Sequence, residues 1–263
     1  EEGVQEVSNG SFSQEGVEEV TNGNFDTDSN WAKGGGATIS DGKANIVGDG
    51  TAFTNISQGG VFTSGKQYIV ELDVIINSGL GLKIQDGANN ENIGFATTSG
   101  TYTFYFTATA NSTILIGRRT GGAAFDSSID NVSVKEVGQD WTLGTGWSIG
   151  DDKAICDGTA NEAIFQANNF IDGKSYKITF DILDYTSGEL ICRFNSNETN
   201  TFNSVGSHTL YFTSDNSFDY VYFKSQSNFI GSISNISVKE VGQDWVIANN
   251  VGTNTRIENN SLV

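Results

Sequence analysis

Hydrophobic and polar residues alternate along almost the whole chain, in short runs separated by Gly, Asn, Asp and Ser. This alternation predicts half-buried β-strands, because successive side chains of a strand point to opposite faces of a sheet. Thr, Val, Ile, Phe and Tyr dominate the runs, as strands favour, and no stretch has the period of an amphipathic helix. In the first half of the chain, strands are predicted at 37–39, 43–47, 60–62, 67–75, 80–84, 101–107, 113–116 and 129–135.

The strand pattern occurs twice because the chain repeats itself. The ten residues that end at Trp141 recur as the ten that end at Trp245, with one change from Val to Ile, and 245 − 141 gives an offset of 104 residues. Self-similarity at this spacing predicts tandem modules. Eight or so antiparallel strands in roughly 110 residues predict a two-sheet sandwich. We therefore expect an all-β protein built of tandem antiparallel jelly-roll β-sandwich modules.

The repeats also set the expected boundaries. Module 1 is expected at 19–137 and module 2 at 138–241, joined by a short Val-Gly linker. Near the N-terminus, residues 3–12 and 16–25 share the pattern Gly-Val-x-Glu-Val-x-Asn-Gly-x-Phe, in which Asn-Gly is a strong turn signal. We expect residues 1–18 to be a connector carrying a short repeat, and residues 242–263 to be the start of a third repeat or a C-terminal tail.

Charge and composition narrow the class of function. The chain has 263 residues, with 14 basic and 32 acidic side chains and a net charge of −18. Such a surface disfavours nucleic acid, which needs basic patches, and anionic membranes. No apolar run approaches the roughly 18 residues of a membrane span. Because the sequence contains no Met, we expect a processed or internal piece of a longer protein.

No catalytic motif is present in the sequence. His208 is the only histidine, and Cys-x-x-Cys and Gly-x-Ser-x-Gly are both missing, which argues against a zinc site and a serine triad. Glycoside hydrolysis needs two carboxylates at a set separation, and none of the many acids lies in a distinctive motif. Cys156 and Cys192 stand at apolar strand positions, which favours buried free thiols over a disulfide. Only the distance between the two residues decides between these forms. We expect neither an enzyme nor a bound cofactor.

The order of motifs in module 1 resembles a known family. The motifs are Asn22-Gly-x-Phe25, Trp31, Ile39-Ser-Asp-Gly-Lys-Ala, Gly65-Lys-x-Tyr and Ile129-Asp-Asn-Val-Ser-Val. This order is similar to that of carbohydrate-binding-module β-sandwiches in the galactose-binding-like superfamily. More narrowly, it resembles the tandem modules of tailed-phage virion proteins such as tail fibres. The resemblance covers both modules and is specific for the fold but not for a ligand.

The resemblance implies a possible metal site in module 1. Sandwiches of this superfamily often hold a structural calcium ion, for which Asn24, Asp26 and Asp130 would supply the hard oxygen ligands. Turn chemistry alone also explains Asn and Asp at such positions. Module 2 is a poorer candidate, because it lacks the Asn-Gly-x-Phe opening and has Ser234 in place of Asp130.

Aromatic residues are the candidates for ligand contact. Trp147 stands where module 1 has Ala37, so we expect an exposed ring on which a sugar can stack. Tyr220 and Tyr222 alternate with apolar neighbours, so one face of their strand is expected to be exposed and open to a sugar ring. These three residues are the predicted ligand-binding set.

Trp31, Trp141 and Trp245 recur at one module position, which favours packing at the module junction over sugar stacking. Together with the resemblance to tailed-phage modules, these features predict a non-catalytic structural or adhesive component of a bacteriophage virion, on its surface or otherwise extracellular. Its modules are expected to pack end to end, to self-associate or bind other virion proteins, and to contact host-surface glycans. The alternative is a set of carbohydrate-binding modules from a secreted bacterial adhesin or polysaccharide-degrading enzyme.

Overall fold

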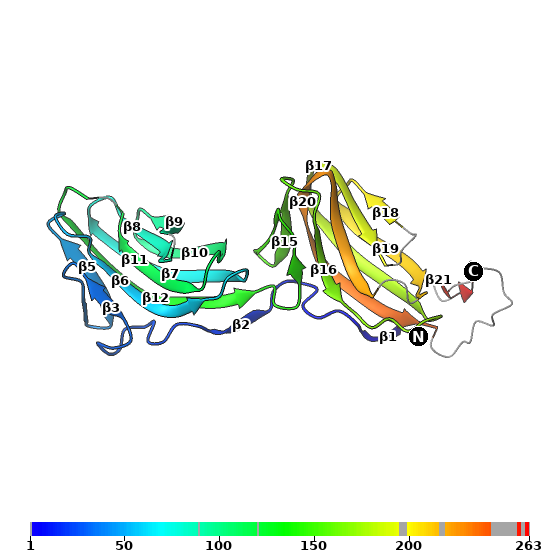
Figure 1. The fold of residues 1–263 in the computed structure, drawn as a ribbon, viewed down its shortest axis with the longest axis horizontal. Helices are drawn as coiled ribbons and strands as arrows, with labels where there is room; N and C mark the ends of the chain where they lie inside the picture. Colours follow the sequence, from blue (N-terminus) through cyan, green and yellow to red (C-terminus); the bar gives the residue numbers. More distant parts are fainter. Residues whose placement is uncertain are drawn as a thin grey trace. The chain divides into compact units, whose positions relative to one another are not determined.

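The computed structural model describes residues 2–88, 90–119, 121–194, 199–215, 219–242, 257–258 and 261–262. All secondary structure in these ranges is β-strand, which confirms the all-β prediction, and none of the described residues forms a helix that could span a membrane. The chain divides into two compact units (Figure 1). We keep the name module 1 for residues 15–137, and we call the unit formed by residues 1–14 and 138–263 module 2.

Module 1 is a sandwich of two antiparallel sheets. Its strands are β2 (Glu15–Glu18), β3 (Ala32–Gly34), β4 (Thr38–Ser40), β5 (Lys43–Gly48), β6 (Asn55–Phe62), β7 (Gln67–Ser78), β8 (Leu82–Asp86), β9 (Glu91–Ala96), β10 (Gly100–Thr107), β11 (Ser112–Arg118) and β12 (Phe125–Val137). One sheet has the order β10-β7-β12-β5-β4, with β2 also paired to β12, and the other has the order β3-β6-β11-β8-β9. All eight strands predicted from the sequence overlap strands of the structure.

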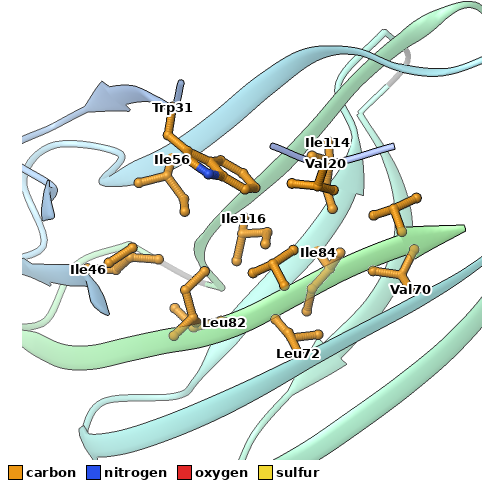
Figure 2. Packing of buried hydrophobic residues seen from close by; sticks show 14 of the residues in the cluster. Val20, Trp31, Ile46, Ile56, Val70, Leu72, Leu82, Ile84, Ile114 and Ile116 are labelled. Atoms are coloured by element: carbon orange, nitrogen blue, oxygen red, sulfur yellow. The ribbon is translucent and has the colours of Figure 1, made fainter. Parts of the chain in front are cut away.

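Alternate side chains of the two sheets meet in the core of module 1. Ile114 and Ile116 on β11 are fully buried, whereas Leu115 between them is only partly covered. Figure 2 shows Ile116 among residues of both sheets, including Ile56 and Leu72, with the Trp31 ring beside them. Burial of such side chains stabilises the fold by about 25 cal/mol per Å² of apolar surface.

Module 2 has the same two-sheet plan with longer strands. They are β1 (Glu2–Gln5), β13 (Thr142–Leu143), β14 (Trp147–Gly150), β15 (Lys153–Asp157), β16 (Ala163–Ala167), β17 (Ser175–Arg193), β18 (Thr199–Phe202), β19 (Gly206–Thr213) and β20 (Tyr220–Val241), followed by a hairpin of β21 (Ile257–Glu258) and β22 (Ser261–Leu262). β17 and β20 each contribute to both sheets, and their pairing changes register near Gly188 and Ser227, both at positive φ. Such bends let one strand switch between the two layers.

The N-terminal segment belongs to module 2, so the expectation that residues 1–18 form a connector is wrong. Gln5 on β1 pairs with Lys239 on β20, while β2 pairs with β12 of module 1. Val7 and Phe12 are 6% and 2% exposed, and Phe12 supplies the Asn-Gly-x-Phe opening that module 2 seemed to lack. Module 1 is therefore inserted into the sequence of module 2, so the modules are nested instead of consecutive. The boundary predicted between residues 137 and 138 agrees with the structure.

Candidate functional site

One sheet of module 2 carries three aromatic rings on its outer face. β16 and β20 pair antiparallel, with Phe165 opposite Tyr222 and Ala167 opposite Tyr220. Tyr220 is 39% exposed, and Phe165 and Tyr222 are half-buried. The ring centroid of Phe165 lies 5.4 Å from that of Tyr220 and 6.2 Å from that of Tyr222. We call Phe165, Tyr220 and Tyr222 the aromatic face.

The strand period explains why these rings point outward. Val221 and Phe223 on β20 are 1% and 0% exposed, so the tyrosines that alternate with them lie on the opposite side of the sheet. This confirms the alternation predicted for Tyr220 and Tyr222. Phe165 was not predicted from the sequence. The repeat did contain a signal for it, because the matching residue of module 1 is Ser57 and the aromatic ring is therefore specific to module 2.

Burial and two charged neighbours determine the protonation of Tyr222. Burial raises the pKa of Tyr222, and the Glu162 carboxylate raises it further, while the positive charge of Arg193 opposes both. Arg193 lies on β17 directly opposite Tyr222. The Tyr222 phenol is therefore protonated at neutral pH and has an O–H group that can donate a hydrogen bond.

A polar cavity of about 490 Å³ borders the aromatic face. The cavity and the face are adjacent because Thr142 on β13 lies opposite Phe165, and Ala167 lies opposite Tyr220. The volume falls in the range of roughly 300–1,000 Å³ that is common for small-ligand sites. The cavity is lined by Glu6, Ser8, Asp140, Thr142, Gln166, Ala167, Asn168 and Asn169.

The cavity wall is fixed by hydrogen bonds to the N-terminal segment. The buried amide of Gln166 accepts the Ser8 N–H (2.8 Å) and donates to the carbonyls of Ser8 and Asp140 (3.0 Å each). Asn168 Nδ2 donates to the Glu6 carbonyl at 2.9 Å. Residues from both sequence segments of module 2 therefore form one surface, on which carboxylate and amide groups can bond hydroxyl groups of a ligand.

Module 1 does not repeat the aromatic face. The register of β11 against β6 places Leu115 opposite Ser57, where module 2 has Tyr222 opposite Phe165. Thr113 stands at the position of Tyr220. The two sheets thus share a backbone plan, but only the sheet of module 2 carries rings at these three places.

The exposed rings of module 1 are already covered on one side by cations. Phe53 and Phe95 are 39% and 41% exposed. Lys83 Nζ lies 4.7 Å from the ring centroid of Phe53, and the Arg119 guanidinium lies 5.0 Å from that of Phe95. A ligand stacking on those faces would have to displace a cation–π contact.

Trp147 is not an exposed platform, so that expectation is wrong. The side chain is 4% exposed, its ring stacks on Phe229 with centroids 6.4 Å apart, and its Nε1 donates to the Glu162 carbonyl at 3.0 Å. The matching Ala37 of module 1 is also buried, at 7% exposure. The position is interior in both modules, and module 2 fills it with a larger side chain.

The junction tryptophans are buried inside their own modules. Trp31 and Trp141 are 5% and 6% exposed, and each indole donates to the carbonyl of an Asn-Gly turn, at Asn22 (3.0 Å) and Asn9 (3.1 Å). Trp245 lies outside the described residues. The end-to-end packing of modules stays a prediction.

The three residues expected to bind calcium in module 1 do not form a cluster of ligands. Asn24 Nδ2 donates to Asp26 Oδ2 at 2.6 Å, and Asp130 Oδ1 accepts the N–H of Asn131 at 2.7 Å. In the described part of the chain, no group of three or more His, Cys, Asp or Glu residues could hold a metal ion. Local turn chemistry accounts for these three residues.

Both cysteines are buried free thiols, as the sequence favoured. Burial raises the pKa of Cys156 and of Cys192, so neither is activated as a nucleophile. The strand carboxylates Asp73 and Asp181 are held by neighbouring side chains instead of facing a shared cavity. Asn131 and Thr101 donate to Asp73, and Asn235 donates to Asp181.

Comparison with known proteins gives weak similarities only. No family model matches the sequence, and no curated protein matches it. Solved structures similar to this chain include the CBM22-1–CBM22-2 tandem domain of Xyn10C from Paenibacillus barcinonensis (12% identity, 90% of this chain and 98% of that chain, TM-score 0.34). A CBM4 structure is also similar, with 19% identity over 49% of this chain and 99% of that chain and a TM-score of 0.27. An allantoicase from Saccharomyces cerevisiae is similar with 9% identity over 73% of this chain and 79% of that chain and a TM-score of 0.28. None reaches a TM-score of 0.5, so none bears on function.

Proposed function

We propose that this protein binds neutral carbohydrate without catalysing a reaction, through the aromatic face and the polar cavity of module 2. The observation that carries the proposal is the adjacency of three partly exposed rings and a cavity lined by carboxylates and amides. A sugar has apolar C–H faces and hydroxyl edges. The faces pack on aromatic rings, and the hydroxyl groups bond to carboxylate and amide oxygens.

Charge favours neutral sugars over acidic ones. The chain carries a net charge of −18, and Glu6 and Asp140 line the cavity itself. A uronic acid or a sulfated sugar would meet like charge there, whereas hydroxyl groups would find strong acceptors. Such ligands occur on cell surfaces and in secreted polysaccharides, so the proposal includes an extracellular location.

A role in a phage virion is a narrower form of this proposal. Nested β-sandwiches and a glycan-binding face suit a fibre or surface appendage, and they suit equally a module of a secreted bacterial adhesin or polysaccharide-degrading enzyme. Self-association and binding to other virion proteins stay predictions. The glycan-binding surface of module 2 is common to all of these settings.

Affinity electrophoresis through gels that contain soluble neutral polysaccharides (glucan, xylan, mannan and galactan) tests the proposal. We expect at least one polysaccharide to retard the chain, and Phe165→Ala or Tyr222→Ala to weaken that binding by about tenfold or more, because a buried ring contact in a binding site is worth about 1.4 kcal/mol or more. Leu115→Ala, the matching substitution in module 1, is the control and should bind as the unmodified chain does.

Two results would contradict the proposal. One is the absence of retardation by every polysaccharide of the panel. The other is an equal effect of Phe165→Ala and Leu115→Ala on retardation, with thermal scans showing that both variants are folded. Binding that is restricted to sulfated or uronic-acid polymers would refute the preference for neutral sugars.

A further inference from the structure

Two exposed phenylalanine rings and two cations form a cluster on the β3-β6-β11-β8-β9 sheet of module 1. Lys83 Nζ lies 4.7 Å from the ring centroid of Phe53, and the guanidinium carbon of Arg119 lies 5.0 Å from that of Phe95. Lys83 on β8 is also the direct cross-strand partner of Phe95 on β9, so the two ring–cation pairs are neighbours. We call Phe53, Lys83, Phe95 and Arg119 the cationic face.

The strand register explains why these side chains lie on one side of the sheet. One row of paired residues crosses β6, β11, β8 and β9 and consists of Asn55, Gly117, Lys83 and Phe95. Phe53 and Arg119 are each two residues away from a member of this row, and side chains two residues apart in an extended chain point the same way. A Cβ at Gly117 would lie 2.8 Å from Phe53 Cζ, so the Phe53 ring covers the glycine in the middle of the row.

The two cations of this face lack acidic partners. In the part of the chain that the structure describes, neither Lys83 nor Arg119 forms an ion pair with a carboxylate, whereas seven other lysines do. The neighbouring residues on the same side of the sheet are also uncharged: Asn55, Gln85, Asn92 and Leu115. Charges more than about 8 Å away are largely screened at physiological salt. The face can therefore attract an anion although the chain as a whole is acidic.

Each cation can hold an anion without leaving its ring. A guanidinium that lies against an aromatic ring keeps N–H groups in its own plane that can bind a carboxylate with two hydrogen bonds. A lysine ammonium has three donors, so one can remain available for a second contact. Phe53 and Phe95 are 39% and 41% exposed. The cationic face thus presents hydrogen-bond donors and apolar ring surface side by side.

Module 2 does not carry this surface. Its register places Ala163, Lys224, Ile191 and Thr201 in the matching row. Asn161 and Gln226 stand at the positions of Phe53 and Arg119. The corresponding sheets of the two modules therefore differ in chemistry, because module 2 has the aromatic face beside acidic cavity residues and module 1 has rings that are paired with cations.

We propose that the cationic face of module 1 is a second carbohydrate site, which binds uronic-acid residues of an acidic polysaccharide. A uronic acid carries a carboxylate and an apolar C–H face on one sugar ring. The carboxylate pairs with Lys83 and Arg119, and the C–H face packs against the exposed part of the phenylalanine rings. The face of a sheet offers side chains and no free backbone edge, which favours a stacked sugar over a peptide that pairs as a strand. The site shares no residue with the neutral-sugar site of module 2.

Titration calorimetry of the full-length chain with a galacturonate oligomer tests this site. We expect binding, and we expect the fully methyl-esterified oligomer to bind at least several-fold more weakly, because it keeps the sugar faces and lacks the charge. Lys83→Gln and Arg119→Gln should each weaken binding several-fold, because each removes one charge-assisted contact. Arg119→Lys keeps the charge and should weaken it less than Arg119→Gln.

Lys43→Gln is the matched control, because it removes one positive charge from β5 in the other sheet of module 1 and should leave binding unchanged. Polyglutamate of similar length is the control for non-specific attraction and should bind several-fold more weakly than the galacturonate oligomer. Circular dichroism confirms that each variant has folded.

Three results would overturn the proposal. They are the absence of galacturonate binding, an equal effect of Lys43→Gln and Lys83→Gln, and an equal affinity for polyglutamate, which would indicate an acidic peptide as the ligand. The outcome is separable from that of the module 2 site. A chain that binds galacturonate but no neutral polysaccharide would refute the module 2 proposal alone, and the reverse result would refute this one alone.

Discussion

Replacement of one N-terminal side chain should destabilise a module whose other residues lie far along the sequence. Phe12 is 2% exposed, and its ring packs 5.2 Å from that of Trp141. Phe12→Ala removes a buried ring and leaves a cavity, at a cost of about 3–5 kcal/mol. The loss falls on module 2, although 128 residues lie between Phe12 and Trp141 in the sequence (141 − 12 − 1).

The magnitude follows from the nature of the site. β20 is held by backbone pairing with β17, and the Trp141 indole is held by its hydrogen bond to the Asn9 carbonyl, so neither can collapse freely into the space. At about 1.4 kcal/mol per factor of ten, the loss accelerates hydrogen exchange through unfolding of module 2 by about two to four orders of magnitude. The midpoint of thermal unfolding of module 2 should fall by on the order of 10–20 °C.

Hydrogen exchange with mass spectrometry measures this effect module by module. Peptides from 138–241 should lose protection in Phe12→Ala, and peptides from 26–137 should keep it. Phe25→Ala is the matched variant, because Phe25 is 1% exposed against Trp31, and it should give the reverse pattern. Unchanged protection of module 2 in Phe12→Ala, or loss confined to module 1, would refute the nested arrangement.

Three further predictions concern stability and reactivity. Gly23→Ala should destabilise module 1 by several kcal/mol in a denaturant titration, because a Cβ there would lie 1.9 Å from the Val132 carbonyl oxygen. Gly59→Ala is the control: its Cβ would meet only Thr113 Oγ1 at 3.7 Å, so it should change stability by less than about 1 kcal/mol. Hydrogen bonds from Ser207 and Asn235 lower the pKa of Asp181 below 3.8. The Asp181 carboxylate therefore stabilises the fold fully above pH 3.8, and this stabilisation is lost as the pH falls through the lowered pKa. Unfolding temperatures measured from about pH 6 to pH 2 should fall less steeply in Asp181→Asn than in the unmodified chain. The buried thiols Cys156 and Cys192 should react with a thiol reagent only after the chain is unfolded, and fast modification of the native chain would contradict their burial.

Much of the fold could be predicted from the sequence because the repeat and the strand period are local signals. The apolar positions of β11 and β12 gave both the strands and their buried faces, and the offset of the repeat gave the boundary at residue 137. These local signals could not show which N-terminal segment supplies the first strand of each module. Residues 2–12 and 15–25 have almost the same sequence, so the pattern identifies a strand in each but does not show which acceptor strand each one pairs with.

The candidate site was predictable only in part, for a reason of packing. Tyr220 and Tyr222 lie on an exposed face because their strand alternates. Trp147 differs from Ala37 of module 1 and was predicted to lie at the surface, but a core position can gain volume where its neighbours also change. Here Phe229 packs on Trp147, and Tyr185 packs on Phe229. Phe165 and the cavity residues Glu6 and Ser8 are brought to the site by long-range strand pairing with β20, which no local pattern reports.

The nested order of the segments has a consequence for synthesis on the ribosome. Residues 2–12 emerge first, the acceptor strand of module 1 is finished at Val137, and that of module 2 is finished at Val241, 104 residues later. At about 5–20 residues per second, residues 2–12 are available for roughly 5–20 s to pair with the similar but incorrect strand β12 of module 1. Residues 15–25 pair with the end of β12 themselves, and Phe25 packs on Trp31 only six residues away. Besides completing module 1, residues 15–25 thus keep the growing chain from closing on the wrong strand.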